Sequence, residues 1–145
     1  MAAPVIWTVP DVLNAARANS VGLLVDHLGI EFIAIGDDWL EARMPVVQHN
    51  KQPAGLLHGG ASLVLAETLA SVGCFHTLDH STQTCVGLEI NANHLRGARA
   101  GFVYGRGTPV HRGRSTQVWE IRVRDNEDRP TCISRCTMAV LTRRD

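Results

Sequence analysis

Residues 52–71 read QPAGLLHGGASLVLAETLAS and contain the start of the most apolar segment of the chain. Apolar side chains fill most positions from Leu63 to Phe75 and leave almost no polar face at a period of 3.6 residues. This pattern predicts a helix from Gly60 to about Thr77 that is apolar around most of its circumference. A helix of that kind is expected to lie buried at the centre of the fold.

The segments on both sides of this helix have the alternating pattern of strands. Before it, residues 30–34 and 40–44 flank the turn Gly36-Asp37-Asp38, and residues 46–58 form a polar loop. After it, alternation predicts strands over 84–94, 101–110, 116–124 and 131–141. Residues 10–27 have the spacing of one or two short amphipathic helices, for which Asp11 is a start signal. We therefore predict an α+β fold in which an antiparallel sheet wraps around one long buried helix.

Length and charge limit the function. A chain of 145 residues predicts one domain spanning 1–145, and 14 basic against 14 acidic residues provide no global attraction for nucleic acid or an anionic membrane. No apolar stretch approaches the ~20 residues that span a bilayer, and the first residues lack the pattern of a signal peptide. No two cysteines have zinc-knuckle or redox spacing, so we expect reduced thiols and a cytoplasmic location. The cysteines are Cys74, Cys85, Cys132 and Cys136.

A carboxylate and a hydroxyl interrupt the apolar helix. Glu67 and Ser71 lie four residues apart and therefore share one face. Glu is rarely buried without a partner or a task, although a narrow solvent stripe or a basic partner would also explain it. At the helix start, the Gly59-Gly60 step exposes N–H donors that can polarise a carbonyl, with His58 beside them. Turn geometry for the glycines and a loop hydrogen bond for His58 are the alternatives.

The stretch 52–71 resembles the signature of hotdog-fold thioesterases, in the branch that acts on aryl and related acyl thioesters. The resemblance runs from about Leu28 to Leu141 and continues in Gly36-Asp37-Asp38, in VGLEINANHLR (86–96), in residues 109–114 and in residues 117–120. It is greatest to bacterial thioesterases of menaquinone synthesis and of catecholate siderophore proofreading. It implies a hotdog fold, hydrolysis of an acyl-CoA thioester, and neither a metal nor a cofactor.

The resemblance also implies a role for each residue of the motif. Glu67 would be the catalytic carboxylate, acting as nucleophile or general base, and the Gly59 N–H would polarise the thioester carbonyl. Gln52 and His58 would orient the carbonyl and assist the leaving thiolate, and Ser71 would place the nucleophile or water. Similar enzymes build the site across a dimer interface, with Gln52 and His58 from one subunit and Glu67 from the other. A homodimer, and further a homotetramer, is therefore implied.

Substrate-binding residues are implied beyond the helix. His94 would lie near the acyl group or the pantetheine arm, although its strand pattern also fits a core or interface histidine. Leu95 replaces a second histidine of some relatives, and Arg96 opens a run of basic residues. Arg114, Ser115 and Thr116 would bind the CoA phosphates, because guanidinium groups suit phosphate.

Three alternatives to an acyl-CoA thioesterase stay open at this point. The enzyme could clear misacylated carrier protein, in which case a carrier-linked substrate would be the better one. A hotdog dehydratase fits poorly, because that class relies on a His and Asp pair placed elsewhere. A non-catalytic acyl binder is compatible with the fold alone and would release no thiol.

His76 and His80 have i, i+4 spacing, but two histidines without a third ligand are weak evidence for a metal.

Overall fold

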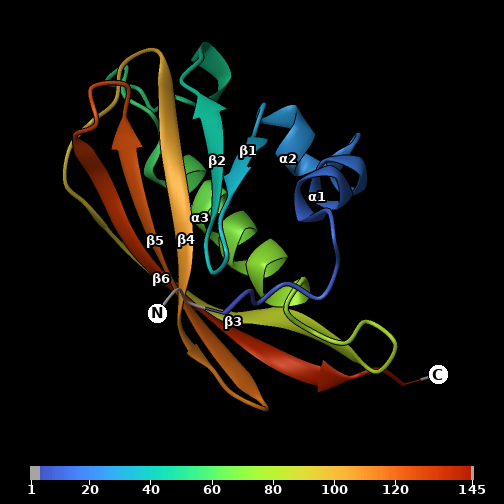
Figure 1. Cartoon of the computed structure of the whole chain (residues 1–145). Coiled ribbons are helices and arrows are strands. Elements are labelled where there is room, and N and C mark those ends of the chain that lie inside the picture. Colours follow the sequence, from blue (N-terminus) through green and yellow to red (C-terminus); the bar gives the residue numbers. More distant parts are fainter. Residues whose placement is uncertain (1–3, 145) are drawn as a thin grey trace.

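A six-stranded antiparallel sheet curves around one long helix in the computed structural model, which describes residues 4–144 (Figure 1). The strand order is β1-β2-β4-β5-β6-β3, so β1 and β3 are the two edges. The predicted α+β architecture is confirmed. The strands are β1 (Glu31–Ile35), β2 (Leu40–Pro45), β3 (Gln83–His94), β4 (Phe102–Arg112), β5 (Thr116–Asp125) and β6 (Pro130–Thr142).

Helix α3 (Gly59–Phe75) packs against the concave face of the sheet. Leu65 and Leu69 are fully buried there, and glycine lets helix and sheet come close. A Cβ atom at Gly73 would lie 2.6 Å from the Trp119 ring of β5, and one at Gly105 would lie 2.7 Å from Leu69. The helix therefore lies directly on β4 and β5, and this contact fixes which of its faces remains free.

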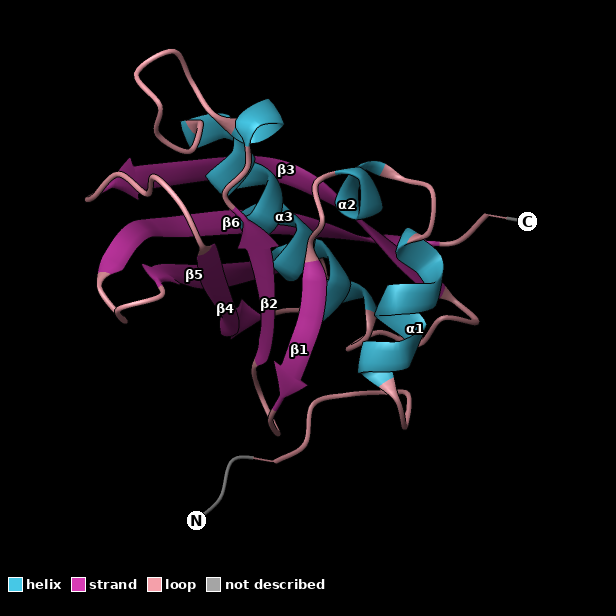
Figure 2. Ribbon diagram, turned by 90° about the horizontal axis from the view of Figure 1, so that it is seen from above, coloured by secondary structure: helices cyan, strands magenta, loops and turns pink. Residues whose placement is uncertain are grey.

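Two short helices precede the sheet and lie along one side of α3 (Figures 1 and 2). They are α1 (Val12–Ser20) and α2 (Leu24–His27). Asp11 caps α1 as expected, because its side chain accepts a hydrogen bond from the Asn14 N–H. The helical conformation is interrupted between α1 and α2 at Gly22, whose φ of 74° lies in the left-handed region that glycine adopts readily.

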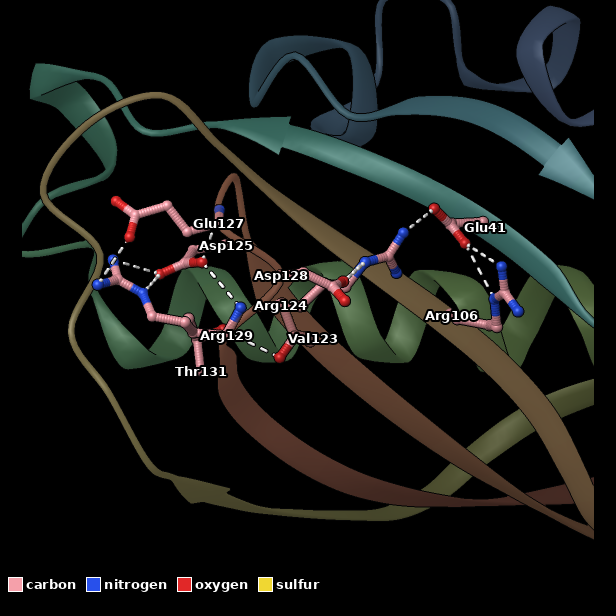
Figure 3. A network of polar contacts seen from close by, with 9 residues as sticks. All are labelled: Glu41, Arg106, Val123, Arg124, Asp125, Glu127, Asp128, Arg129 and Thr131. Atoms are coloured by element: carbon pink, nitrogen blue, oxygen red, sulfur yellow. Dashed lines mark hydrogen bonds and ion pairs between the residues drawn. The ribbon is translucent and has the colours of Figure 1, made fainter.

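Strand β2 differs from the half-buried strand that its alternation predicts. Leu40, Ala42 and Met44 are buried as expected, but Glu41 on the opposite face is also only 4% exposed. Arg106 of β4 and Arg124 of β5 both form ion pairs with this carboxylate, at 2.9 and 2.7 Å (Figure 3). The two guanidinium groups compensate the cost of burying the Glu41 charge. The alternation of apolar and polar residues along this strand could not predict partners from other strands.

The edge strand β3 also departs from its simple alternation. Its pairing with β6 shifts register between Gly87 and Glu89, which is the mark of a β-bulge. Val86 and Leu88 are 47% and 61% exposed, and His94 is exposed rather than part of the core. An exposed apolar edge of this kind is a template for pairing with another strand.

No helix among the described residues is long and apolar enough to cross a membrane.

Candidate active site

A short hairpin-like loop brings Gln52 to the start of α3. Lys51 and Leu57 form an isolated antiparallel bridge, and the Gln52 N–H donates to the Leu56 carbonyl. The loop is held by Asn50, which is 4% exposed and bonds the Val47 N–H and the Pro45 carbonyl. The Asn50 carbonyl in turn accepts from the His58 N–H. One buried amide residue thus ties the Gln52 loop to the helix start.

His58 caps α3 with both its side chain and its carbonyl. Its Nδ1 accepts from the Gly60 N–H at 2.9 Å, and its carbonyl accepts from the Ala61 and Ser62 N–H groups. Of the first four N–H groups of the helix, only that of Gly59 has no hydrogen-bond partner among the described residues. The Gly59 N–H is therefore a free donor at the positive end of the α3 dipole, and an oxyanion site requires such a donor.

Gln52, Gly59 and His94 line a common cavity of about 380 Å³ with Leu95 and Arg96. A Cβ atom at Gly59 would lie 3.0 Å from the His94 ring, so glycine lets strand β3 and the helix start approach. The Gln52 Oε1 accepts from the Ala54 N–H, which leaves its NH2 group free to donate. Five of the expected site residues are thus brought together by the fold.

Glu67 lies elsewhere, on the free face of α3. It is exposed, so in the single chain the alternative of a narrow solvent stripe holds rather than the buried setting that its apolar neighbours suggested, and no described residue forms a hydrogen bond or ion pair with it. Its carboxylate lies over the β3 bulge, where a Cβ atom at Gly87 would be 2.7 Å from Oε1. The sheet covers one side of α3 and the helices α1 and α2 lie along another, so Glu67 is on the part of the helix surface that remains exposed in the single chain.

Ser71 shares the face of Glu67, as the i, i+4 spacing predicts. The two residues line a hollow of about 340 Å³ with residues of α2. The Ser71 hydroxyl lies 3.9 Å from the Met138 sulfur, and its carbonyl lies 3.9 Å from the Cys85 sulfur. The expected catalytic set is therefore divided within one chain between two separate hollows.

The expected phosphate-binding residues lie at the far end of the sheet. Thr116 pairs with Ala139, which pairs in turn with Val86 near the start of β3. His94 is at the opposite end of β3, so Arg114, Ser115 and Thr116 are not near Arg96 in the same chain. The fold does not bring these two groups together in one protomer.

Neither hollow has the donor set of a metal centre. No group of three or more His, Cys, Asp or Glu side chains among the described residues is placed to hold an ion. His80 Nε2 lies 2.7 Å from the Phe75 carbonyl, and His76 is buried with Nδ1 unpartnered among the described residues. Burial and the neighbouring His80 lower the pKa of His76.

Two site residues were missed by sequence reasoning. Gly87 was visible only as one polar-face position of an alternating strand, and nothing local marks it as the residue beneath Glu67. Asn50 stands in a polar loop, where Asn is common. Its burial depends on contacts that only the folded loop makes.

Sheet topology, central helix and helix-start donor together define a hotdog-fold enzyme of the thioesterase class. The chain belongs to the thioesterase superfamily, whose family model matches residues 54–132. It is 50% identical over 136 residues to the 1,4-dihydroxy-2-naphthoyl-CoA hydrolase of Escherichia coli, which covers 94% of this chain and 99% of that one. The proofreading thioesterase EntH of Cronobacter turicensis is 49% identical over 136 residues, 94% of this chain and 98% of that one.

Solved structures agree with these relatives. A mutant thioesterase of Pseudomonas aeruginosa superposes with a TM-score of 0.93 at 46% identity, covering 95% of this chain and 99% of that chain. A thioesterase of Haemophilus influenzae superposes with a TM-score of 0.91 at 44% identity, covering 94% and 95%. The protein is therefore an acyl-thioester hydrolase.

Proposed function

We propose that the protein hydrolyses acyl-CoA thioesters to the free acid and CoA, at a site to which two chains contribute. The observation that carries this proposal is the free Gly59 N–H at the start of α3, with the donors of Gln52 and His58 close by. A carbonyl oxygen bound there develops negative charge in the transition state, and a preorganised donor stabilises it.

Glu67 supplies the carboxylate of the reaction. It either attacks the carbonyl carbon, forming a mixed anhydride that water then hydrolyses, or takes a proton from the attacking water. In both routes the C–S bond breaks and CoA leaves as a thiolate. The accepting Nδ1 of His58 is unprotonated, so the neutral ring carries its proton on Nε2 and can donate to that sulfur.

A second copy of the chain would bring the two separated parts of the site together. Glu67 lies over Gly87, and Gly59 lies against His94, which is seven residues or about 23 Å further along β3. If the β3 edges of two chains pair antiparallel about an axis between Ile90 and Asn91, Gly87 of one chain lies opposite the partner's His94. The exposed Val86 and Leu88 support pairing at this edge. Each dimer would then contain two complete sites.

The same pairing supports the expected CoA contacts. It would bring the Arg114-Ser115-Thr116 turn of one chain toward Arg96 of the other, because the turn adjoins the Val86 end of β3. Arg96 forms no ion pair within the described residues, whereas six other arginines are paired with carboxylates. An unpaired guanidinium at the cavity remains available for phosphate.

For the acyl group we propose an aryl or related acyl class. The 1,4-dihydroxy-2-naphthoyl-CoA hydrolase and the proofreading thioesterase are similar over nearly the whole chain, which supports a role in menaquinone or siderophore synthesis. A carrier-protein thioester is the second candidate, because the similarity to a proofreading thioesterase is as great as that to the CoA thioester hydrolase. A much higher kcat/KM with an acyl-carrier substrate than with the matching CoA would favour it.

The central test is thiol release from a panel of aroyl-, β-ketoacyl- and alkanoyl-CoAs. Release with at least one class is expected, and none with any substrate would overturn hydrolysis. The shared site is tested by mixing Glu67→Ala with Gln52→Ala after partial unfolding and refolding. Hybrid dimers contain one undamaged site, so activity should return on mixing. Two variants that stay inactive together, although they form hybrids, would show that each chain has its own site.

A further inference from the structure

Two thiols meet where α3 ends and β3 begins. Residues 76–82 lead from the last turn of the helix to the first residues of the strand (Figure 1). Cys74 of α3 is buried, and its thiol donates a hydrogen bond to the sulfur of Cys85 on β3. The Cys85 sulfur also lies 3.9 Å from the Ser71 carbonyl, which is one helical turn before Cys74. Both sulfurs are therefore at the same contact between helix and strand.

Cys85 is the accessible member of this pair. It is half-buried and lines a hollow of about 280 Å³ between α1, α3 and β3, whereas Cys74, Cys132 and Cys136 are buried. The hydrogen bond from Cys74 lowers the pKa of Cys85, while burial raises the pKa of Cys132 and raises that of Cys136 to about 12. Because the thiolate is the reactive form, a small oxidant that enters the hollow should react first at Cys85.

We propose that Cys74 and Cys85 are a redox modification site, at which a peroxide converts the two thiols to a disulfide. The Cys85 thiolate attacks one oxygen of hydrogen peroxide, the O–O bond breaks, and a sulfenic acid and hydroxide result. The Cys74 sulfur then attacks the sulfenic sulfur, so that the S–S bond forms, the S–O bond breaks, and the hydroxyl leaves with the Cys74 proton as water. The two thiols lose two electrons in total, and the peroxide is reduced to water.

The reduced pair is prepared for the second step as well as the first. The hydrogen bond with Cys85, and then burial, raise the pKa of Cys74 and keep it a thiol while Cys85 is a thiolate. The first of these causes disappears when Cys85 becomes a sulfenic acid, which favours attack by Cys74. A thiol reductant reverses the disulfide, as is usual for redox-sensing pairs in reducing compartments.

The disulfide would disturb the contact beneath Glu67. Its sulfurs are about 2.05 Å apart, closer than those of two hydrogen-bonded thiols, so the end of α3 and the start of β3 must move together. Gly87 is two residues after Cys85 on β3, and Glu67 is about two helical turns before Cys74 on α3. The movement is therefore transmitted to Gly87, over which the carboxylate lies. The oxidised enzyme should be slower, a consequence that rests on the proposed function because it takes Glu67 as the catalytic group.

Peptide mapping of the wild-type protein tests the pair independently of turnover. The reduced protein is exposed to hydrogen peroxide, unfolded, and treated with N-ethylmaleimide to block the remaining thiols. Two of the four cysteines should no longer react, and a peptide pair that joins Cys74 to Cys85 should appear and be separated by dithiothreitol. Four free thiols, a disulfide to Cys136 instead, or oxygen adducts without a linked peptide would each overturn the proposal.

Three variants separate the pair from general oxidation. Cys132→Ala is the matched control, since it removes a buried thiol outside the contact, and its linked peptide should form as in the wild type. Cys85→Ala should form no linked peptide. Cys74→Ala leaves the Cys85 sulfenic acid without a second thiol, so oxidation should continue to a sulfinic acid. A linked peptide between other cysteines in Cys85→Ala, at the wild-type rate, would contradict the role of Cys85.

Thiol release from an acyl-CoA substrate, measured after catalase has removed the peroxide, tests the effect on turnover. Oxidation should lower kcat of the wild type about tenfold or more, dithiothreitol should restore it, and Cys85→Ala should be nearly unaffected. An unchanged kcat in protein shown to contain the disulfide, or an equal loss in Cys85→Ala, would overturn the coupling to Glu67. If no acyl-CoA releases thiol even in the reduced protein, the proposed function is wrong, and the linked peptide still tests the pair.

Discussion

The carboxylate of Glu67 lies over Gly87, where any side chain larger than hydrogen would have to displace it. A Cβ atom at Gly87 would lie 2.7 Å from Oε1, closer than atoms of a folded protein approach without displacement. The contact joins the middle of α3 to the bulge of the edge strand. The absence of a side chain at Gly87 therefore leaves room for the proposed catalytic carboxylate at this point.

Gly87→Ala should therefore lower activity without lowering stability. The added methyl group displaces the carboxylate, and a misplacement of about 1 Å can reduce turnover about 100-fold. Alanine in place of a strand glycine stabilises the fold by about 0.5–1 kcal/mol where the backbone allows it. Urea unfolding and kcat measure the two effects. Thr84→Ala on the same strand is the control for activity and should leave kcat unchanged; a normal kcat in Gly87→Ala would contradict the contact's importance.

Glu67→Ala should reduce kcat by several powers of ten, because removal of one essential group often costs that much. The free energy of unfolding should be nearly unchanged, since the side chain is exposed and forms no hydrogen bond or ion pair with the described residues. Thiol release and urea unfolding are compared with the wild type. Near-normal turnover would show that the carboxylate is not the catalytic group.

His58 is expected to have separable structural and catalytic roles. His58→Ala removes the side-chain cap of α3 and should lower stability by about 1 kcal/mol, together with activity. His58→Asn restores a capping side chain but has no ring N–H. Stability should return in this variant while kcat stays low. Recovery of both would assign His58 to capping alone.

Asn50→Ala should disturb the Gln52 loop. It leaves the Val47 N–H and the Pro45 carbonyl without their partner in a partly buried place, at a cost of about 1 kcal/mol. Because the same residue positions Gln52 and His58, kcat/KM should fall as well. Gln48→Ala, on the exposed side of the loop, serves as the control. A loss of stability with unchanged kcat/KM would limit Asn50 to a structural role.

The buried ring of His76 should make stability depend on pH. Burial, and then the neighbouring His80, lower its pKa below the ordinary 6.5, so the folded protein takes up this proton at a lower pH than the unfolded chain does. As the pH falls below 6.5, the unfolded chain binds a proton that the folded chain does not, and the free energy of unfolding decreases. Urea titrations at pH 7.5 and 5.5 should show a smaller decrease in His76→Phe than in the wild type. Equal decreases would mean that His76 does not contribute.

Several features of this protein could be predicted from the spacing of residues in the sequence. The N-cap at Asp11, the span of α3 and the shared face of Glu67 and Ser71 depend on residues within a turn or two of each other, so they follow from sequence periodicity. Gln52 and Gly59 meet because only a short loop separates them. The order of strands and helix was sufficient to predict an antiparallel sheet wrapped around α3.

Tertiary structure alone decided the rest. The burial of Glu41 depends on two arginines from other strands, and the place of Gly87 beneath Glu67 depends on the packing of α3 against β3. The division of Glu67 from Gly59 and His94 follows from the length of β3. These relations join residues far apart in sequence, through strand register and packing, and no local pattern encodes a distance of that kind.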